Sequence, residues 1–143
     1  MEQNYKNHVR YYVPHHFVFY PVMLLVMGFC VGRSFDNENW LIWVFLFLAF
    51  FSVTLLSFML RQHYALTLQD RIVLQELRYR YFATTGQRLE PYEDKLSKGQ
   101  LFALRFAPDE EMPALLEKAI ADNLDSKAIK KSIKNWKADN QRV

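Results

Sequence analysis

Four histidines are the side chains of this sequence best suited to hold a metal ion or a haem iron. His15 and His16 precede the first apolar stretch, His63 follows the second, and His8 lies near the N-terminus. If the two stretches form an antiparallel hairpin, the positions before the first and after the second share one depth. Imidazole nitrogens at one depth could ligate a transition metal or haem.

The competing interpretation is that these histidines are amphipathic residues at a membrane interface, satisfied by headgroups and water. We favour it, because no acidic residue stands beside them and because the adjacent His15 and His16 cannot easily face one point. We therefore expect no metal and no cofactor. A redox or metal-binding membrane subunit that uses His8, His15, His16 and His63 remains the alternative.

A second group with possible chemistry is basic. The last predicted helix runs from Asp125 or Ser126 to about Ala138, with Ile129, Ile133 and Trp136 on its apolar side. Opposite this side five lysines fall within about 120° of arc: Lys127, Lys130, Lys131, Lys134 and Lys137. Such a face, with Trp136 beside it, is a solvated surface, a contact for anionic lipid headgroups, or a contact for nucleic acid or an acidic protein.

Composition and missing motifs exclude several function classes. The 143 residues carry 18 Lys and Arg against 15 Asp and Glu, and a net charge of +3 is too small to imply a nucleic-acid partner. The single cysteine excludes an intrachain disulfide and a cysteine-cluster zinc site. We find no phosphate-binding glycine loop and neither G-x-S-x-G nor H-E-x-x-H, so we expect no enzyme. A lipid-acting enzyme would lack any recognisable pair of nucleophile and base.

The elements that position these residues are two apolar spans. Residues 40–60 contain no charge, glycine or proline and would cover about 31 Å as a helix, the hydrocarbon thickness of a bilayer. Residues 17–32 form a weaker span, for which a signal peptide is the competing interpretation. No small-x-small cleavage site follows it, and we favour an uncleaved helix.

Charges flanking the spans predict their orientation. Lys6 and Arg10 precede the first span, the loop 33–39 has one positive and two negative charges, and the first arginines after the second span are Arg61, Arg71, Arg78 and Arg80. The positive-inside rule places both termini in the cytoplasm and the short loop outside. Gly28 and Gly32 form a G-x-x-x-G pair that could let another helix approach, most simply the second span near Trp43 and Phe47.

Beyond the membrane the second helix should continue to Thr84 or Thr85, with Gly86 as its C-cap. It carries two nearly opposite apolar stripes, one with Tyr64, Leu68, Ile72, Tyr79 and Phe82, the other with Leu66, Val73, Leu77 and Tyr81. A surface helix needs one stripe, so the second indicates a further contact with the N-terminal segment, a second copy or a partner. We expect a loop at 87–96 and then three short helices, with caps at Ser97, Asp109 and Asp125 or Ser126.

We expect the N-terminal segment, residues 4–16, to pack along the second helix around residues 63–71, because a hairpin brings the two together. Tyrosines and hydrogen-bonding groups on one side would meet polar groups on the other. The residues of this predicted interface are Tyr5, Arg10, Tyr11, Gln69, Asp70 and Arg71.

Several stretches together resemble a family of small bacterial two-span membrane proteins that is catalogued only as a domain of unknown function. They are NYKNHVRY at 4–11, PHH at 14–16, QDR at 69–71, LFALRFAPDEEMP at 101–113 and IKKSIKNWKAD at 129–139. The resemblance covers nearly the whole chain. It implies a bacterial inner-membrane protein and supplies no activity, cofactor or catalytic residue.

The sequence thus predicts an all-α membrane protein in three parts: a cytoplasmic segment 1–16, a transmembrane hairpin 17–60, and a cytoplasmic helical domain 61–143. We expect a non-enzymatic accessory or scaffold protein that belongs to, or interacts with, a membrane complex. Its partners would be membrane lipids and either another protein or further copies of itself, bound through the juxtamembrane helix.

Overall fold

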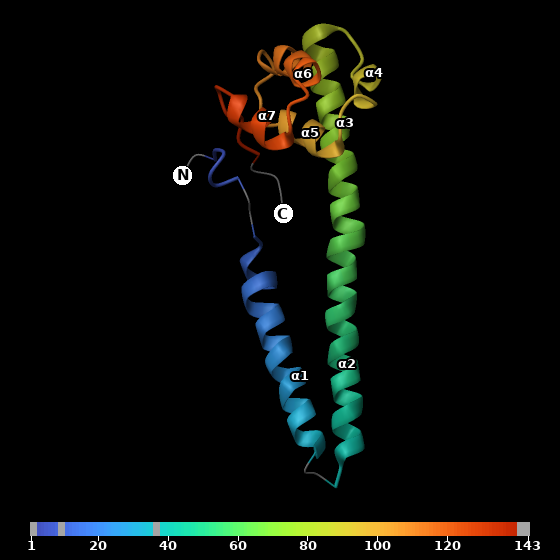
Figure 1. The fold of residues 1–143 in the computed structure, drawn as a ribbon. Helices are drawn as coiled ribbons and strands as arrows, with labels where there is room; N and C mark the ends of the chain where they lie inside the picture. Colours follow the sequence, from blue (N-terminus) through green and yellow to red (C-terminus); the bar gives the residue numbers. More distant parts are fainter. Residues whose placement is uncertain (1–2, 9–10, 36–37, 140–143) are drawn as a thin grey trace. The chain divides into compact units, whose positions relative to one another are not determined.

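The structure is a computed structural model of the chain, and it describes residues 3–8, 11–35 and 38–139. All regular structure in these residues is helical, as we predicted. The chain divides into two compact units (Figure 1). The apolar unit comprises residues 11–67, and the polar unit comprises residues 1–10 together with 68–142.

The apolar unit consists of two long helices that lie side by side and run in opposite directions (Figure 1). The first is the π-helix η1 (Pro14–Phe19) followed by α1 (Tyr20–Phe35), and the second is α2 (Trp40–Met59) followed by the π-helix η2 (Leu60–Ala65). Pro14 begins η1, where its missing N–H leaves no bond unmade. Both stretches are long and apolar enough to cross a membrane.

The first helix extends three residues beyond the predicted span at each end, so Arg33 and Ser34 lie in its last turn and not in the loop. The Arg33 guanidinium lies 5.7 Å from the centre of the Trp43 ring, and Ser34 Oγ donates a hydrogen bond of 2.7 Å to the Val31 carbonyl. These two contacts let polar side chains continue the helix.

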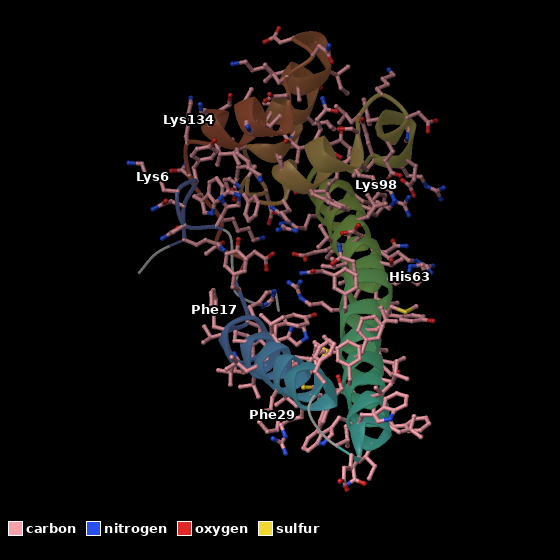
Figure 2. The ribbon with its side chains drawn as sticks, turned by 60° about the horizontal axis from the view of Figure 1, so that its bottom comes forward. Lys6, Phe17, Phe29, His63, Lys98 and Lys134 are labelled. Carbon is pink, nitrogen blue, oxygen red and sulfur yellow. The ribbon has the colours of Figure 1, made fainter. Side chains whose placement is uncertain are left out.

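Side chains of the apolar unit are largely exposed. No residue of α2 is buried, and Cys30 is the buried residue of α1. Phe29 packs edge-on against Trp43, with 5.6 Å between ring centres. Figure 2 shows that the sticks along α1 and α2, Phe17 and Phe29 among them, are almost entirely carbon. Two helices cannot cover each other on all sides, so most of this carbon surface faces outward.

The polar unit begins in the helix that continues from η2. Helix α3 (Leu66–Thr85) completes a single helix of 46 residues, Trp40–Thr85. Gly86 ends it as predicted, with φ of 70° and an N–H that donates to the Phe82 carbonyl at 2.8 Å. A residue with a Cβ would be strained at this φ.

Four short helices follow α3: α4 (Glu90–Glu93), α5 (Lys98–Leu104), α6 (Met112–Ala121) and α7 (Ser126–Ser132). Together with α3 they enclose one apolar core. Its fully buried members include Leu77, Leu89, Leu104, Met112, Leu116 and Ile129. The predicted loop at 87–96 therefore contains the short α4, with Pro91 in its first turn.

The helix caps agree with the sequence at two places and differ at a third. Ser97 and Gln100 form a capping box at α5, and Asp125 accepts a hydrogen bond of 2.6 Å from the Ala128 N–H at α7. We predicted Asp109 as the N-cap of α6, and this prediction was wrong. The N-cap of α6 is Glu111, and the Asp109 carboxylate binds Arg80 instead.

Helix α7 is shorter than predicted, because it ends at Ser132 and the backbone of Ile133 is extended. Contacts from other parts of the chain take over the backbone beyond this point. The Glu111 carboxylate accepts from the N–H groups of Lys134 and Asn135 at 2.8 and 3.3 Å, and the Phe106 carbonyl accepts from the N–H of Lys137 at 2.8 Å.

Candidate interaction surfaces

The predicted histidine cluster is divided between the two units. His8 belongs to the polar unit, and His15, His16 and His63 belong to the apolar unit. His15 shares a hydrogen bond of 2.9 Å with Ser57 Oγ, which links α2 to the start of the first helix. Among the described residues no group of three His, Cys, Asp or Glu side chains is arranged to hold a metal ion.

The N-terminal segment contacts the C-terminal part of the chain. The ring of His8 lies between those of Tyr5 and Trp136, at 6.0 and 5.9 Å between ring centres, and Trp136 stacks on Phe106 at 4.6 Å. Gln3, itself buried, accepts a hydrogen bond of 2.7 Å from the Asp139 N–H. These rings and this hydrogen bond form what we call the terminal clasp, made of residues 3–8, Phe106 and residues 130–139.

The interface that we expected between the N-terminal segment and Gln69, Asp70 and Arg71 stays a prediction. Tyr5 and His8 contact the C-terminal segment: Lys131 lies over the Tyr5 ring, and the His8 ring lies against that of Trp136. Tyr11 belongs to the apolar unit and is exposed. Arg10 lies outside the described residues.

The five lysines expected on one helix face are separated by the early end of α7. Lys134 and Lys137 lie beyond the end of the helix, and Lys137 Nζ is 3.6 Å from the Asp109 carboxylate. Lys130 Nζ is 3.1 Å from His8 Nε2, and Lys131 lies over the Tyr5 ring at 5.8 Å. Lys127 on α7 is exposed. Two of these lysines therefore support the terminal clasp.

Gly28 and Gly32 do not mediate the contact between α1 and α2. We had expected this glycine pair to face the second span. Both are exposed, and a Cβ placed on either would meet no atom within 4 Å. Phe29 makes that contact through the Trp43 ring, and the neighbouring Cys30 is buried. A spacing of four places two glycines on one helix side, but it does not say which side meets the neighbour.

Arg80 is a buried cation whose role we did not predict. Its guanidinium donates to the carbonyls of Arg105 and Ala107 at 2.9 and 2.5 Å and to the Asp109 carboxylate at 2.5 Å. The hydrogen bond from Arg80 holds the pKa of the Asp109 carboxyl below its ordinary value, and Lys137 adds to this effect against a smaller opposing effect of burial. The sequence signal is weak: Arg80 precedes Tyr81 and follows Leu77 on the side of α3 that faces the core.

The two stripes of α3 have opposite environments. Val73, Leu77 and Tyr81 are buried in the core. Leu68, Ile72, Tyr79 and Phe82 keep 58%, 67%, 73% and 55% of their surface exposed. With the exposed Gln75 between them, these four residues form what we call the exposed face of α3. Tyr64, the remaining member of that stripe, is also exposed and lies in the apolar unit.

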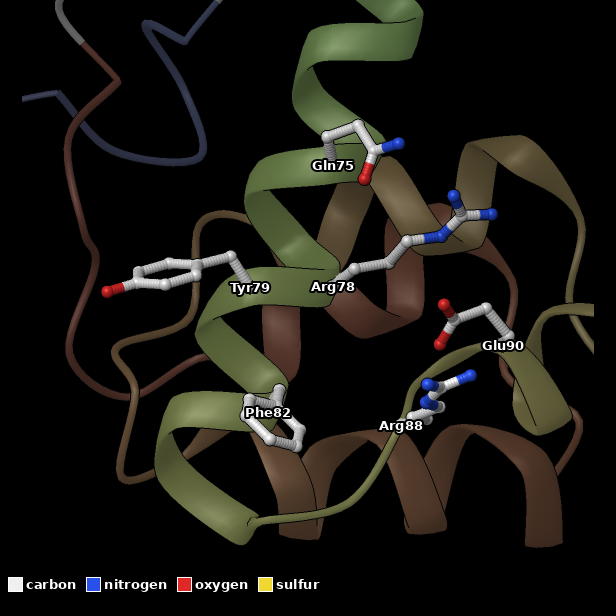
Figure 3. Close-up of a pocket in the computed structure, with 6 residues that line it drawn as sticks. All are labelled: Gln75, Arg78, Tyr79, Phe82, Arg88 and Glu90. Carbon is white, nitrogen blue, oxygen red and sulfur yellow. The ribbon is translucent and has the colours of Figure 1, made fainter.

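A shallow depression of about 430 Å³ lies beside the exposed face of α3. Figure 3 shows Gln75, Arg78, Tyr79 and Phe82 projecting from α3 and Arg88 and Glu90 from the segment that follows it. Arg78 is held by a bidentate pair with Glu93, at 2.6 and 2.7 Å. The depression is open to solvent and lined by side chains of mixed character, which suits a contact surface better than an enclosed reaction site.

The whole chain, residues 1–143, matches the profile of the family described as "Family of unknown function (DUF6526)", and the chain therefore belongs to this family. This confirms the resemblance to a family of unknown function. Neither the curated proteins nor the solved structures match the chain.

Proposed function

We propose that this member of the family is a non-enzymatic protein of the bacterial inner membrane that serves as an accessory or scaffold subunit. In this proposal α1 and α2 cross the bilayer as a hairpin, and the polar unit lies in the cytoplasm. Membrane lipids surround the apolar unit, and a protein binds the exposed face of α3.

The lengths and exposure of the two helices support the hairpin. Pro14–Phe35 has 22 residues, about 33 Å at 1.5 Å per residue, and α2 has no buried residue. The core helix of a soluble protein would be buried. Cleavage of the first helix as a signal peptide would also remove Gln3, Tyr5 and His8, which are built into the terminal clasp.

The terminal clasp also supports a common side for both ends of the chain. Residues 3–8 contact residues 130–139 within the polar unit, and such a contact requires an even number of membrane crossings between them. The arginines that follow the second span favour the cytoplasm as that side.

The single observation that carries the interaction role is the exposed face of α3. Four large apolar side chains, each more than half exposed, stand opposite the stripe that the core already covers. Apolar side chains gathered at one surface mark an interaction site more often than scattered ones do.

Two measurements test this proposal in the full chain, starting from a Cys30→Ser background. A cysteine at Glu38 should react with a membrane-impermeant maleimide from outside the cell, and a cysteine at Lys118 on α6 should not. Labelling of the Glu38 position only from the cytoplasm would overturn the topology. A photoreactive residue at Tyr79 should form a covalent protein adduct in native membranes, whereas one at the exposed Lys118 should not.

The alternative of a metal or haem subunit stays a prediction from the histidines. A UV–visible spectrum and metal analysis of the detergent-purified protein test it directly. A stoichiometric haem or metal that disappears with His15→Ala or His63→Ala would favour this alternative over the scaffold.

A further inference from the structure

We propose that the occupant of the exposed face of α3 is α3 of a second copy, paired in parallel as a short two-stranded coiled coil. This deepens the proposed function and rests on it, because two chains anchored in one membrane present their α3 helices in the same direction. The argument uses residues 68–82, all of which lie in the polar unit.

The spacing along the exposed face is that of a coiled-coil seam. Leu68, Ile72, Gln75, Tyr79 and Phe82 follow one another at intervals of four, three, four and three residues. This assigns Ile72 and Tyr79 to heptad position a and the other three to position d. A helix that used this face only to meet solvent would have no reason to keep large apolar residues at these intervals.

The opposite side of the same helix fits the assignment. Val73 and Leu77 fall at positions b and f, which point away from an a/d seam, and both are buried in the core of their own chain. The seam is therefore free in this chain, whereas the rest of the apolar surface of α3 is already used.

Charges that flank the seam select a second copy in parallel. Arg71 falls at position g and Glu76 at position e of the next heptad, five residues later. In a parallel pair, g of one helix lies opposite this e position of the other, so the dimer contains two symmetric Arg71–Glu76 pairs. Both side chains are exposed, and neither forms an ion pair with another residue in the described part of the chain.

The remaining charged position agrees with this register. Arg78 also falls at position g, but Glu93 of its own chain neutralises it, and Ala83 stands at the e position opposite. An antiparallel pair would instead bring g against g and place Arg71 of one copy near Arg78 of the other. Gln75 adds a polar residue to the middle of the seam, a feature that fixes register in coiled coils.

Disulfide trapping of the full chain in membranes tests the dimer. In the Cys30→Ser background, single cysteines at Ile72 or Gln75 should give a covalent dimer under mild oxidation, because equivalent seam positions face each other across the two-fold axis. A cysteine at Thr84, exposed and at position f of the same helix, is the matched control and should remain monomeric.

A charge reversal tests the register independently. In the Gln75→Cys protein, Arg71→Glu should lower the trapped dimer severalfold by placing two acids opposite each other, and Glu76→Arg should do the same with two bases. Combining both substitutions should restore the dimer, which a merely structural role of either residue does not predict. All these side chains are exposed, so the fold should persist, as far-UV circular dichroism will show.

Three outcomes would overturn the dimer: no trapping at Ile72 and Gln75, equal trapping at Thr84, or no rescue by the double reversal. If the dimer fails while the photoreactive residue at Tyr79 captures a different protein, the proposed scaffold function stands and only its partner changes. If the Glu38 cysteine is labelled only from the cytoplasm, the proposed function fails as well.

Discussion

The two sides of α3 carry side chains of the same kind and have opposite environments. On one side Leu77 keeps 1% of its surface exposed, and on the other Ile72 keeps 67%. The sequence pattern alone presents both as apolar stripes. An apolar stripe on a surface helix therefore indicates that this side makes a contact. It does not tell whether the contact is with the same chain or with another molecule. Substitutions on the two sides should therefore affect different properties, folding on one and association on the other.

The largest expected effect comes from a cavity on the buried side. Leu77→Ala should lower the free energy of unfolding by about 2–5 kcal/mol, because Leu77 is fully enclosed and its truncation leaves a cavity in the core. Ile72→Ala, the matched change on the exposed side, should alter the free energy of unfolding of the monomeric chain by only about 0.5 kcal/mol. Urea titration in detergent, followed by circular dichroism, measures both. Equal losses for the two variants would contradict the contrast between the sides.

A second contrast compares two arginines of the same helix. Arg80→Ala should cost about 2–3 kcal/mol of stability, because it leaves the carbonyls of Arg105 and Ala107 without their charged donor. Arg71→Ala should leave stability within about 0.5 kcal/mol of the parent, because Arg71 is exposed. The same titration measures these values. A stable Arg80→Ala protein would show that other donors satisfy these carbonyls.

The smallest expected effect is a dependence on pH. Since Arg80 lowers the pKa of Asp109 in the folded chain, the ionised carboxylate contributes stability above its ordinary pKa of 3.8. That contribution is lost as the pH falls through the lower folded pKa. As the pH falls from about 5 to below 3.8, the Asp109→Asn protein should therefore lose less stability than the parent protein. Thermal melting across this range measures the difference, and parallel curves for the two proteins would rule out the role of this carboxylate.

Local patterns in the sequence predicted the features that local physics decides. The uninterrupted apolar run from Trp40, the glycine at position 86 and the caps at Ser97 and Asp125 are set by neighbours within four residues. The two stripes of α3 were also visible, because they follow from helical periodicity. Which stripe is buried depends on α5 to α7, and no local pattern contains that information.

The errors have long-range causes. Ile129, Ile133 and Trp136 have helical spacing, but α7 ends at Ser132, and the carboxylate of Glu111 accepts hydrogen bonds from the backbone N–H groups of Lys134 and Asn135. Asp109 has the sequence context of an N-cap, but its carboxylate binds the guanidinium of Arg80, 29 residues away, and not the first turn of α6. In both cases a charged side chain distant in sequence outweighed a weak local preference.

The terminal clasp joins two segments that are far apart in the sequence, so it can form only late in the synthesis of the chain. Gln3 and His8 are synthesised well before Trp136 and Asp139, yet Gln3 is hydrogen-bonded to Asp139 and the His8 ring lies against that of Trp136. The N-terminal segment must therefore wait through the synthesis of both apolar helices before its binding surface exists. A tag inserted beside residue 3 or residue 139 would lie next to the terminal clasp, so the length of its linker affects whether the clasp can close.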